Sequence, residues 1–162
     1  MTNTPETLDA LKSIIKSARV AMLVTHSPEN RLVARPMQLQ EVEFDGDLWF
    51  LTRTDTDKYE EIKTNDDVNV IISEKSYASI SGTAEIADDL NKKKEFWNKA
   101  YEVMFDMDYT DPRLILIKVK SETAEYWETG SMIKSAYNFM KKVVGKEEPV
   151  EPGKSTNETL KL

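Results

Sequence analysis

Short apolar segments of strand length, separated by turn signals, divide most of this chain. Residues 19–25 are rich in apolar side chains and end at the turn sequence HSPEN at 26–30. The pair Asp45-Gly46 lies between residues 41–44 and 48–52, and such a pair between two apolar segments is a strong hairpin signal. This spacing favours antiparallel pairing between neighbouring strands.

The remaining pattern predicts further strands at residues 31–40, 68–73, 77–86 and 113–127. Gly82 interrupts the third of these segments, which indicates a bend or a bulge. Helices are expected where apolar residues recur at helical spacing, with Asp55 or Thr56 as the cap of the second. The predicted helices cover residues 5–18, with Thr4 as the N-cap, 55–63, 90–105 and 131–144.

Six or so strands, with helices inserted between them rather than alternating with them, indicate a mainly β fold. The predicted architecture is a six-stranded antiparallel barrel with peripheral helices, formed as one domain by residues 1–144. From Gly145 onward the chain has few apolar residues and many Lys, Glu, Pro, Ser, Thr and Asn residues. This composition predicts a disordered C-terminal tail over residues 145–162.

The composition of the 162-residue chain excludes several functions. It contains no cysteine and one histidine, His26, which removes disulfides, cysteine nucleophiles and a histidine-based metal cluster. Its formal net charge of −7 argues against a nucleic-acid partner. No apolar run approaches the roughly 20 residues of a membrane span, and the polar N-terminus has no signal-peptide pattern. We therefore expect a cytoplasmic protein with no metal site and no membrane partner.

Arg35 lies inside a predicted strand, directly before Pro36. Because proline cannot donate a ladder hydrogen bond, the strand is either irregular or at a sheet edge there. An arginine fixed at such a point can present its planar set of donors to a carboxylate, a phosphate or a polar ring edge. The alternative is a surface arginine with a solvated head.

A second candidate lies where residues 48–52 end and the predicted helix 55–63 begins. Free backbone N–H groups and the positive end of the helix dipole favour an anion at such a point. Thr52 could donate a hydroxyl there, and Lys58 would add a positive charge. The alternative is a capped helix with a solvated lysine, in which Asp55 and Asp57 already supply negative charge.

The three tryptophans have core packing as their usual role. Trp97 fits the apolar stripe of its predicted helix, whereas Trp49 and Trp127 lie in predicted strands. Trp127 stands at the end of the last of these strands.

Taken together, these segments resemble the FMN-binding split β-barrel superfamily. This is the pyridoxamine 5′-phosphate oxidase-like group, and the segments are most similar to its bacterial general stress protein branch. The resemblance extends over about residues 5–144. It is carried, in order, by MLVT at 22–25, ARPM at 34–37, DLWFLT at 47–52, Lys58, SISGTAE at 79–85, FW at 96–97, DP at 111–112 and AEYW at 124–127.

The resemblance implies a six-stranded Greek-key split barrel that forms a homodimer, with FMN at the subunit interface. The residues that it implies for cofactor binding are Arg35, Pro36, Met37, Gln38, Trp49, Phe50, Leu51, Thr52, Lys58 and Trp127.

These residues correspond to different parts of the implied site. Residues 35–38 correspond to a strand along the isoalloxazine ring and ribityl chain of FMN. Residues 49–52 correspond to the next strand, whose end binds the phosphate together with Lys58. Trp127 corresponds to an aromatic residue that approaches the flavin of the partner subunit.

The implied activity is that of an FMN-dependent oxidoreductase using reduced nicotinamide, in which the cofactor carries the redox chemistry. Oxidation of pyridoxamine 5′-phosphate itself is not expected. Asp57-Lys58 has one positive charge fewer than the usual basic pair, and the sequence ETGSM at 128–132 stands in place of an arginine-rich motif. A non-enzymatic flavin carrier or sensor, and a barrel that binds haem or deazaflavin, remain alternatives.

Overall fold

The computed structural model of this chain describes residues 5–41, 43–128 and 157–162. Its strands are β1 (Val20–His26), β2 (Leu32–Gln38), β3 (Asp47–Arg53), β4 (Asp67–Ser73), β5 (Tyr77–Ala87), β6 (Leu114–Trp127) and β7 (Asn157–Lys161). Its helices are α1 (Pro5–Ser17), α2 (Asp57–Thr64), α3 (Leu90–Phe96) and α4 (Lys99–Phe105). All seven strands belong to one antiparallel sheet, in the order β2-β1-β4-β5-β6-β3, and β7 pairs with β6 outside this path.

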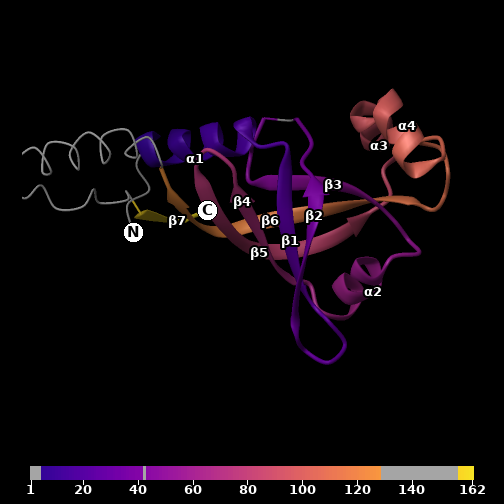
Figure 1. Cartoon of the computed structure of the whole chain (residues 1–162), viewed down its shortest axis with the longest axis horizontal. Coiled ribbons are helices and arrows are strands. Elements are labelled where there is room, and N and C mark those ends of the chain that lie inside the picture. Colours follow the sequence, from indigo (N-terminus) through magenta and orange to yellow (C-terminus); the bar gives the residue numbers. More distant parts are fainter. Residues whose placement is uncertain (1–4, 42, 129–156) are drawn as a thin grey trace, which may run out of the picture.

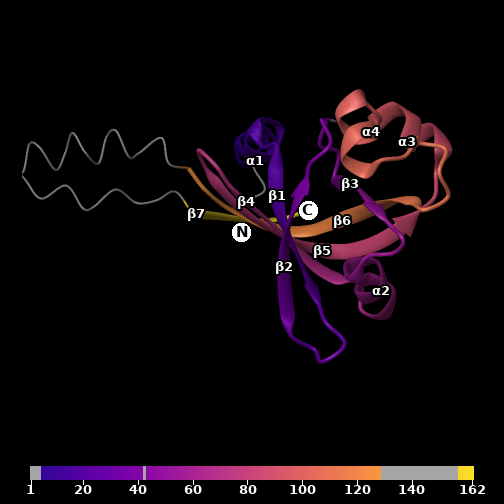
Figure 2. The same ribbon diagram turned by 45° about the vertical axis from the view of Figure 1, so that its right-hand side comes forward.

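The sheet is strongly coiled, and the helices lie around it. β1 and β2 run steeply across β5 and β6 in both views (Figure 1 and Figure 2). α2, α3 and α4 lie toward one end of β6, whereas β7 lies at the other end. No helix in the described ranges combines the length and the apolar character that crossing a bilayer requires.

The predicted antiparallel, mainly β fold with peripheral helices is confirmed, but the hairpin predicted at Asp45-Gly46 is wrong. β2 already ends at Gln38, and β3 pairs with β6, where Arg53 lies opposite Leu114. The chain still turns at Gly46, which has a φ of +111° and accepts a hydrogen bond from the Ser121 N–H at 2.9 Å. A local turn signal cannot reveal that the partner strand lies so far along the chain.

The sheet has seven strands and not the predicted six, because residues 157–161 form β7. The prediction of a disordered tail is therefore wrong for these residues. Residues 145–156 and the predicted helix 131–144 lie outside the described residues. β7 pairs with residues 123–127 of β6, and its Leu160 is 1% exposed within the larger apolar cluster. One buried leucine thus anchors this otherwise polar strand to the core.

Replacing Leu160 by alanine is expected to lower the free energy of unfolding by about 2 to 3 kcal/mol, since it removes a buried side chain from a packed cluster. Denaturant unfolding measures the change. Leu162→Ala is the matched control, because Leu162 is 37% exposed and should change stability by less than about 0.5 kcal/mol. Equal stability of the Leu160 variant and the unchanged protein would mean that β7 does not contribute to the core.

Closure of the sheet into a barrel stays a prediction. β2 and β3 stand at the two ends of the strand order, and the pairing of the described strands does not join them. The bend predicted at Gly82 is confirmed as a register shift between Ser81 and Gly82 in the β5–β6 pairing.

Among the described strands, β6 is the longest and has three partners. It pairs with β5 on one side, and on the other side it pairs first with β3 and then with β7.

Two apolar clusters lie on opposite faces of β3. Leu48 and Phe50 belong to the larger cluster, together with residues of α1 and of the inner face of the sheet. Leu51 belongs to the smaller cluster with residues of α3 and α4, and Trp49 packs against it. The alternation of strand side chains therefore sends neighbouring residues of β3 into different environments.

The predicted helix 90–105 is divided into α3 and α4. Asp89 caps α3 and Asn98 caps α4, since each side chain accepts a hydrogen bond from an N–H three residues later. Trp97 lies between the two helices, packs against the smaller cluster and stacks on Tyr101, with 5.9 Å between ring centroids. This is the packing role that the sequence predicts for Trp97.

Candidate functional site

The turn between β3 and α2 holds the predicted anion-binding residues. Thr52, near the end of β3, is 2% exposed, and its hydroxyl lies 3.5 Å from that of Thr56. Thr56 occupies the N-cap position of α2, but its hydroxyl donates to the carbonyl of Arg53 at 2.8 Å and does not cap the helix. The helix therefore begins without a capping side chain, and its first-turn N–H groups can donate to an anion.

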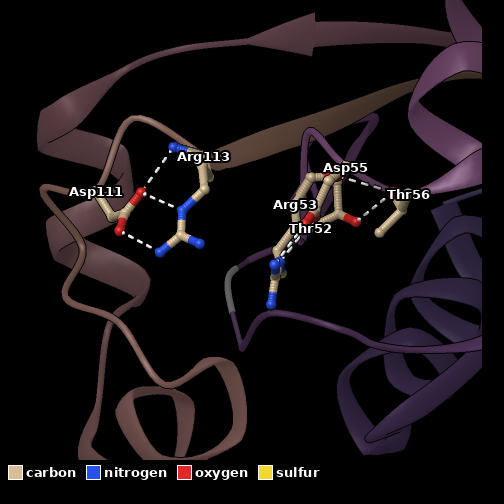
Figure 3. A network of polar contacts seen from close by, with 6 residues as sticks. All are labelled: Thr52, Arg53, Asp55, Thr56, Asp111 and Arg113. Carbon is tan, nitrogen blue, oxygen red and sulfur yellow. Dashed lines mark hydrogen bonds and ion pairs between the residues drawn. The ribbon is translucent and has the colours of Figure 1, made fainter.

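Two acidic residues near this turn, Asp55 and Asp111, pair with arginines (Figure 3). Asp55 accepts a hydrogen bond from Arg53 Nε at 2.8 Å and a shorter one from Nη2 of the same residue. Asp111 accepts from Arg113 Nε at 3.1 Å and Nη2 at 2.9 Å. These side-chain hydrogen bonds lower the pKa of Asp55, and they lower the pKa of Asp111 to about 2. Arg53 thus offsets part of the charge of Asp55, although this aspartate still acts on Lys58 in the first turn of α2.

Arg35 reaches from β2 toward α2, where two side chains hold its guanidinium. Its Nη1 donates to Thr25 Oγ1 at 2.6 Å, and its Nη2 donates to Glu61 Oε2 at 3.0 Å. The side chain of Arg35 is 19% exposed and that of Glu61 8% exposed. Arg35 is therefore not the solvated surface arginine of the alternative interpretation, and its other N–H donors are not used by these two bonds.

Lys58 lies in the first turn of α2 and is partly buried. Burial lowers its pKa and the positive charge of Arg35 lowers it further, while Asp57 and Glu61 oppose the shift. Within the described ranges, no carboxylate forms an ion pair with Lys58. Asp57 is exposed, so that solvent screens its charge.

The formal charges of Arg35, Lys58 and Glu61 therefore sum to one positive charge, and the charge of Arg35 acts on Lys58 although Arg35 is paired with Glu61. Such an arrangement attracts a further anion, because an anion relieves the repulsion between the two cations. We call Thr25, Arg35, Thr52, Lys58 and Glu61 the α2 site.

The other predicted β2 residues lie on both faces of the strand. Met37 is 8% exposed and belongs to the larger apolar cluster, whereas Pro36 and Gln38 are exposed on the opposite face. β2 stands at the end of the strand order, as the position of Pro36 predicts. The side chains of Arg35 and Met37 thus face inward. A ligand along this edge would contact the side chains of Pro36 and Gln38 only if it lay on the outer face of the sheet.

Of the four predicted β3 residues, the structure brings only the Thr52 side chain to the start of α2. Phe50 is 0% exposed in the larger cluster. Trp49 faces α3, with its ring centroid 6.0 Å from that of Phe96 and 5.2 Å from Lys92 Nζ, and Leu51 lies in the cluster of that side. The described contacts of these three side chains are apolar packing and, for Trp49, contacts of its ring with the ammonium groups of Lys92 and Lys118.

Trp127 lies far from the α2 site of its own chain. β3 residue Thr52 pairs with Ile115 near the start of β6, and Trp127 ends the same strand. A strand of 14 residues spans about 40 Å. Trp127 therefore cannot meet Thr52 or Lys58 within one subunit, and it lies opposite Tyr77 of β5.

Thr25 and Glu61 are the two residues of the α2 site that sequence reasoning missed. Glu61 is three residues after Lys58 and so shares a face of α2 with it, a spacing that could have drawn attention to it. Thr25 meets Arg35 only because Leu23 pairs with Arg35, which puts Thr25 diagonally across from it. A single sequence does not give that register.

A family model described as "Pyridoxamine 5′-phosphate oxidase like" matches residues 6–150 of this chain. Protein bli-3 of Neurospora crassa is 30% identical over 132 residues, which cover 74% of this chain. The match covers 63% of the length of that relative.

Solved structures share the fold. A putative general stress family protein of Xanthomonas campestris is 28% identical, with a TM-score of 0.69, over 81% of this chain and 92% of that protein. A pyridoxamine 5′-phosphate oxidase-related, FMN binding protein of Nostoc punctiforme is 16% identical, with a TM-score of 0.62, over 79% of this chain and 87% of that protein.

Proposed function

This chain belongs to the pyridoxamine 5′-phosphate oxidase-like family, and from that membership we propose that it is a homodimeric FMN-binding flavoprotein. We further propose that it exchanges electrons between a reduced nicotinamide donor and a small acceptor. The isoalloxazine ring supplies this redox chemistry when FMN is bound, and the protein binds and orients the cofactor. The FMN-binding relative of similar fold supports the choice of cofactor.

The observation that carries the proposal is the charge of the α2 site. Two cations, Arg35 and Lys58, act on each other beside one buried carboxylate, and α2 begins without a capping side chain. A terminal phosphate carries about −1.5 to −2 charge near pH 7 and accepts several hydrogen bonds. The residues present therefore fit the phosphate of FMN, with Thr52 as a further hydroxyl donor. In this proposal the side chain of Arg35 binds the phosphate, and not the ring and ribityl chain that the resemblance implies for residues 35–38.

An apolar outer face of the sheet supports the homodimer. Pro36, Met22 and Ile71 lie opposite one another across β2, β1 and β4, and Ile71 is 38% exposed. Leu32, four residues before Pro36 and on the same face of β2, is 71% exposed. Burial of this face against a second copy would remove apolar surface from water. It would also explain how Trp127, remote from its own α2 site, reaches a flavin.

Pyridoxamine 5′-phosphate is not the substrate in this proposal, because Asp57 stands where a second basic residue would be needed beside Lys58. A flavin carrier or sensor is the second candidate. It is favoured by the ion pair of Glu61 with Arg35, because this pair and the hydrogen bond from Thr25 engage the one carboxylate of the α2 site, which is then not free to act as an acid or a base.

Titration of the purified protein with FMN tests the proposal. We expect a perturbed flavin absorbance spectrum that saturates at one FMN per chain, and elution from gel filtration at the dimer mass. Bleaching of the bound flavin by reduced nicotinamide without oxygen would support the oxidoreductase, and its absence would favour the carrier. A colourless protein that elutes as a monomer and leaves the FMN spectrum unchanged would rule out both, and haem and deazaflavin would then be the next ligands to titrate.

A further inference from the structure

Glu61 accepts hydrogen bonds from both of the β-strand residues that it faces. Its Oε2 atom accepts from the hydroxyl of Thr25 and from Arg35 Nη2. Thr25, which is 0% exposed, also accepts from Arg35 Nη1 at 2.6 Å. The three side chains close a ring of hydrogen bonds that joins α2 to β1 and β2.

This ring fixes the direction of the Arg35 side chain. A free arginine loses rotamer entropy when a ligand immobilises it, whereas an arginine that is already held loses less. Arg35 is 19% exposed, and the ring uses only one donor on each terminal nitrogen. The guanidinium can therefore bind a further anion without leaving Glu61 and Thr25.

We propose, on the basis of the FMN binding proposed above, that Glu61 is a positioning residue that holds Arg35 for the phosphate of the ligand. Glu61 acts through Arg35 and does not touch the phosphate, since its own negative charge would repel that group. By holding Arg35, Glu61 sets how strongly the site prefers FMN to riboflavin. An ion pair with a purely structural role would affect the binding of both flavins alike.

Two substitutions separate the positioning of Arg35 from the charge of Glu61. Glu61→Asp keeps the charge but shortens the side chain by one methylene, so that it cannot reach both partners with the same geometry. Glu61→Gln removes the charge but keeps the length and an acceptor oxygen. If Glu61 acted only as a charge, Glu61→Gln would strengthen FMN binding and Glu61→Asp would leave it unchanged.

The measurement is the ratio of the riboflavin Kd to the FMN Kd, obtained by fluorescence titration of the full chain. We expect Glu61→Asp to lower this ratio about tenfold, the size of one charge-assisted hydrogen bond, and Glu61→Gln to stay within about threefold of the unchanged protein. Glu60→Asp is the matched control. Glu60 lies beside Glu61 in the same helix but is exposed, with Lys63 as its ion-pair partner, and its ratio should not change.

The same substitution in an Arg35→Ala background tests whether Glu61 acts through Arg35, and we expect no further fall in the ratio there. A ratio unchanged by Glu61→Asp, an equal loss of both flavins, or a further fall without Arg35 would overturn the proposal. If Glu61→Asp does not fold, Thr25→Val carries the test, because it opens the ring without changing a charge; an unchanged ratio in that variant overturns the proposal too. Absence of FMN binding by the unchanged protein would reject the proposed function, and this inference with it.

Discussion

Replacing Lys58 by alanine is expected to weaken FMN binding by roughly 10- to 100-fold while riboflavin binding changes by less than about twofold. A hydrogen bond between charged groups contributes about 1.5 to 3 kcal/mol, and each 1.4 kcal/mol corresponds to about tenfold in affinity. Lys58 has no ion-pair partner among the described residues, so its removal leaves no buried carboxylate newly unpaired. The loss should therefore come from the ligand phosphate alone. Fluorescence titration with the two flavins measures it.

The control for Lys58 lies one turn further along α2. Lys63 is 49% exposed, pairs with Glu60 at 3.6 Å and lies over the ring of Tyr59. Lys63→Ala removes the same charge from the same helix, and we expect it to change neither Kd by more than about twofold, since exposed ion pairs contribute little. Equal losses of FMN and riboflavin in Lys58→Ala would contradict the phosphate assignment, because riboflavin has no phosphate.

Replacing Gly82 by alanine is expected to destabilise the fold by about 3 kcal/mol. A Cβ atom at this position would lie 2.0 Å from the Lys120 carbonyl oxygen and 2.9 Å from its carbon. Both are backbone atoms of β6, so they can give way only if the strand moves, and overpacking of this kind costs about 1 to 3 kcal/mol or more. For a chain of this size the melting temperature should fall by about 6 to 12 °C. Thermal unfolding followed by circular dichroism measures the change.

Gly46→Ala is the control for a glycine that is required for a different reason. A Cβ atom at Gly46 would meet nothing within 4 Å, but the φ of +111° is one that side chains rarely adopt. We expect a cost of about 1 kcal/mol, from backbone strain alone. If the two variants melted at the same temperature, the close approach of β5 and β6 at Gly82 would not be the reason for its glycine.

The strands were predictable because apolar alternation is a local property of the chain. β1, β4, β5 and β6 lie within a few residues of their predicted segments, and Gly82 marks the register shift in β5. The pairing of β3 was not predictable from Asp45-Gly46, since its partner is set by the larger cluster that Phe50 helps to form. β7 was missed because a single leucine, Leu160, is too little to reveal an apolar pattern.

Part of the candidate site was also predictable from the sequence. Arg35 and Lys58 were identified as candidate anion ligands, and the structure brings them within each other's electrostatic influence. The sequence could not show that Glu61 faces Arg35, because that contact joins a helix to a strand at the edge of the sheet. Trp49 and Thr52 were both predicted as cofactor ligands, but they lie on opposite faces of β3. Strand alternation already places residues at odd spacing on opposite faces.

The position of β6 has a consequence for how the chain folds. β3 has no sheet partner until β6 has formed, since Arg53 pairs with Leu114, about 60 residues further along the chain. β7 then pairs with the same strand, β6. Pairing across such long stretches of chain raises the contact order, and sheets of this kind fold in milliseconds to seconds rather than microseconds. During that interval the edge of β3, with its apolar side chains, is open to pairing with other molecules. Conditions that shorten this interval, or that lower the concentration of partly folded chains during it, should therefore raise the yield of native protein. They should do so more than any change to the surface of the finished fold.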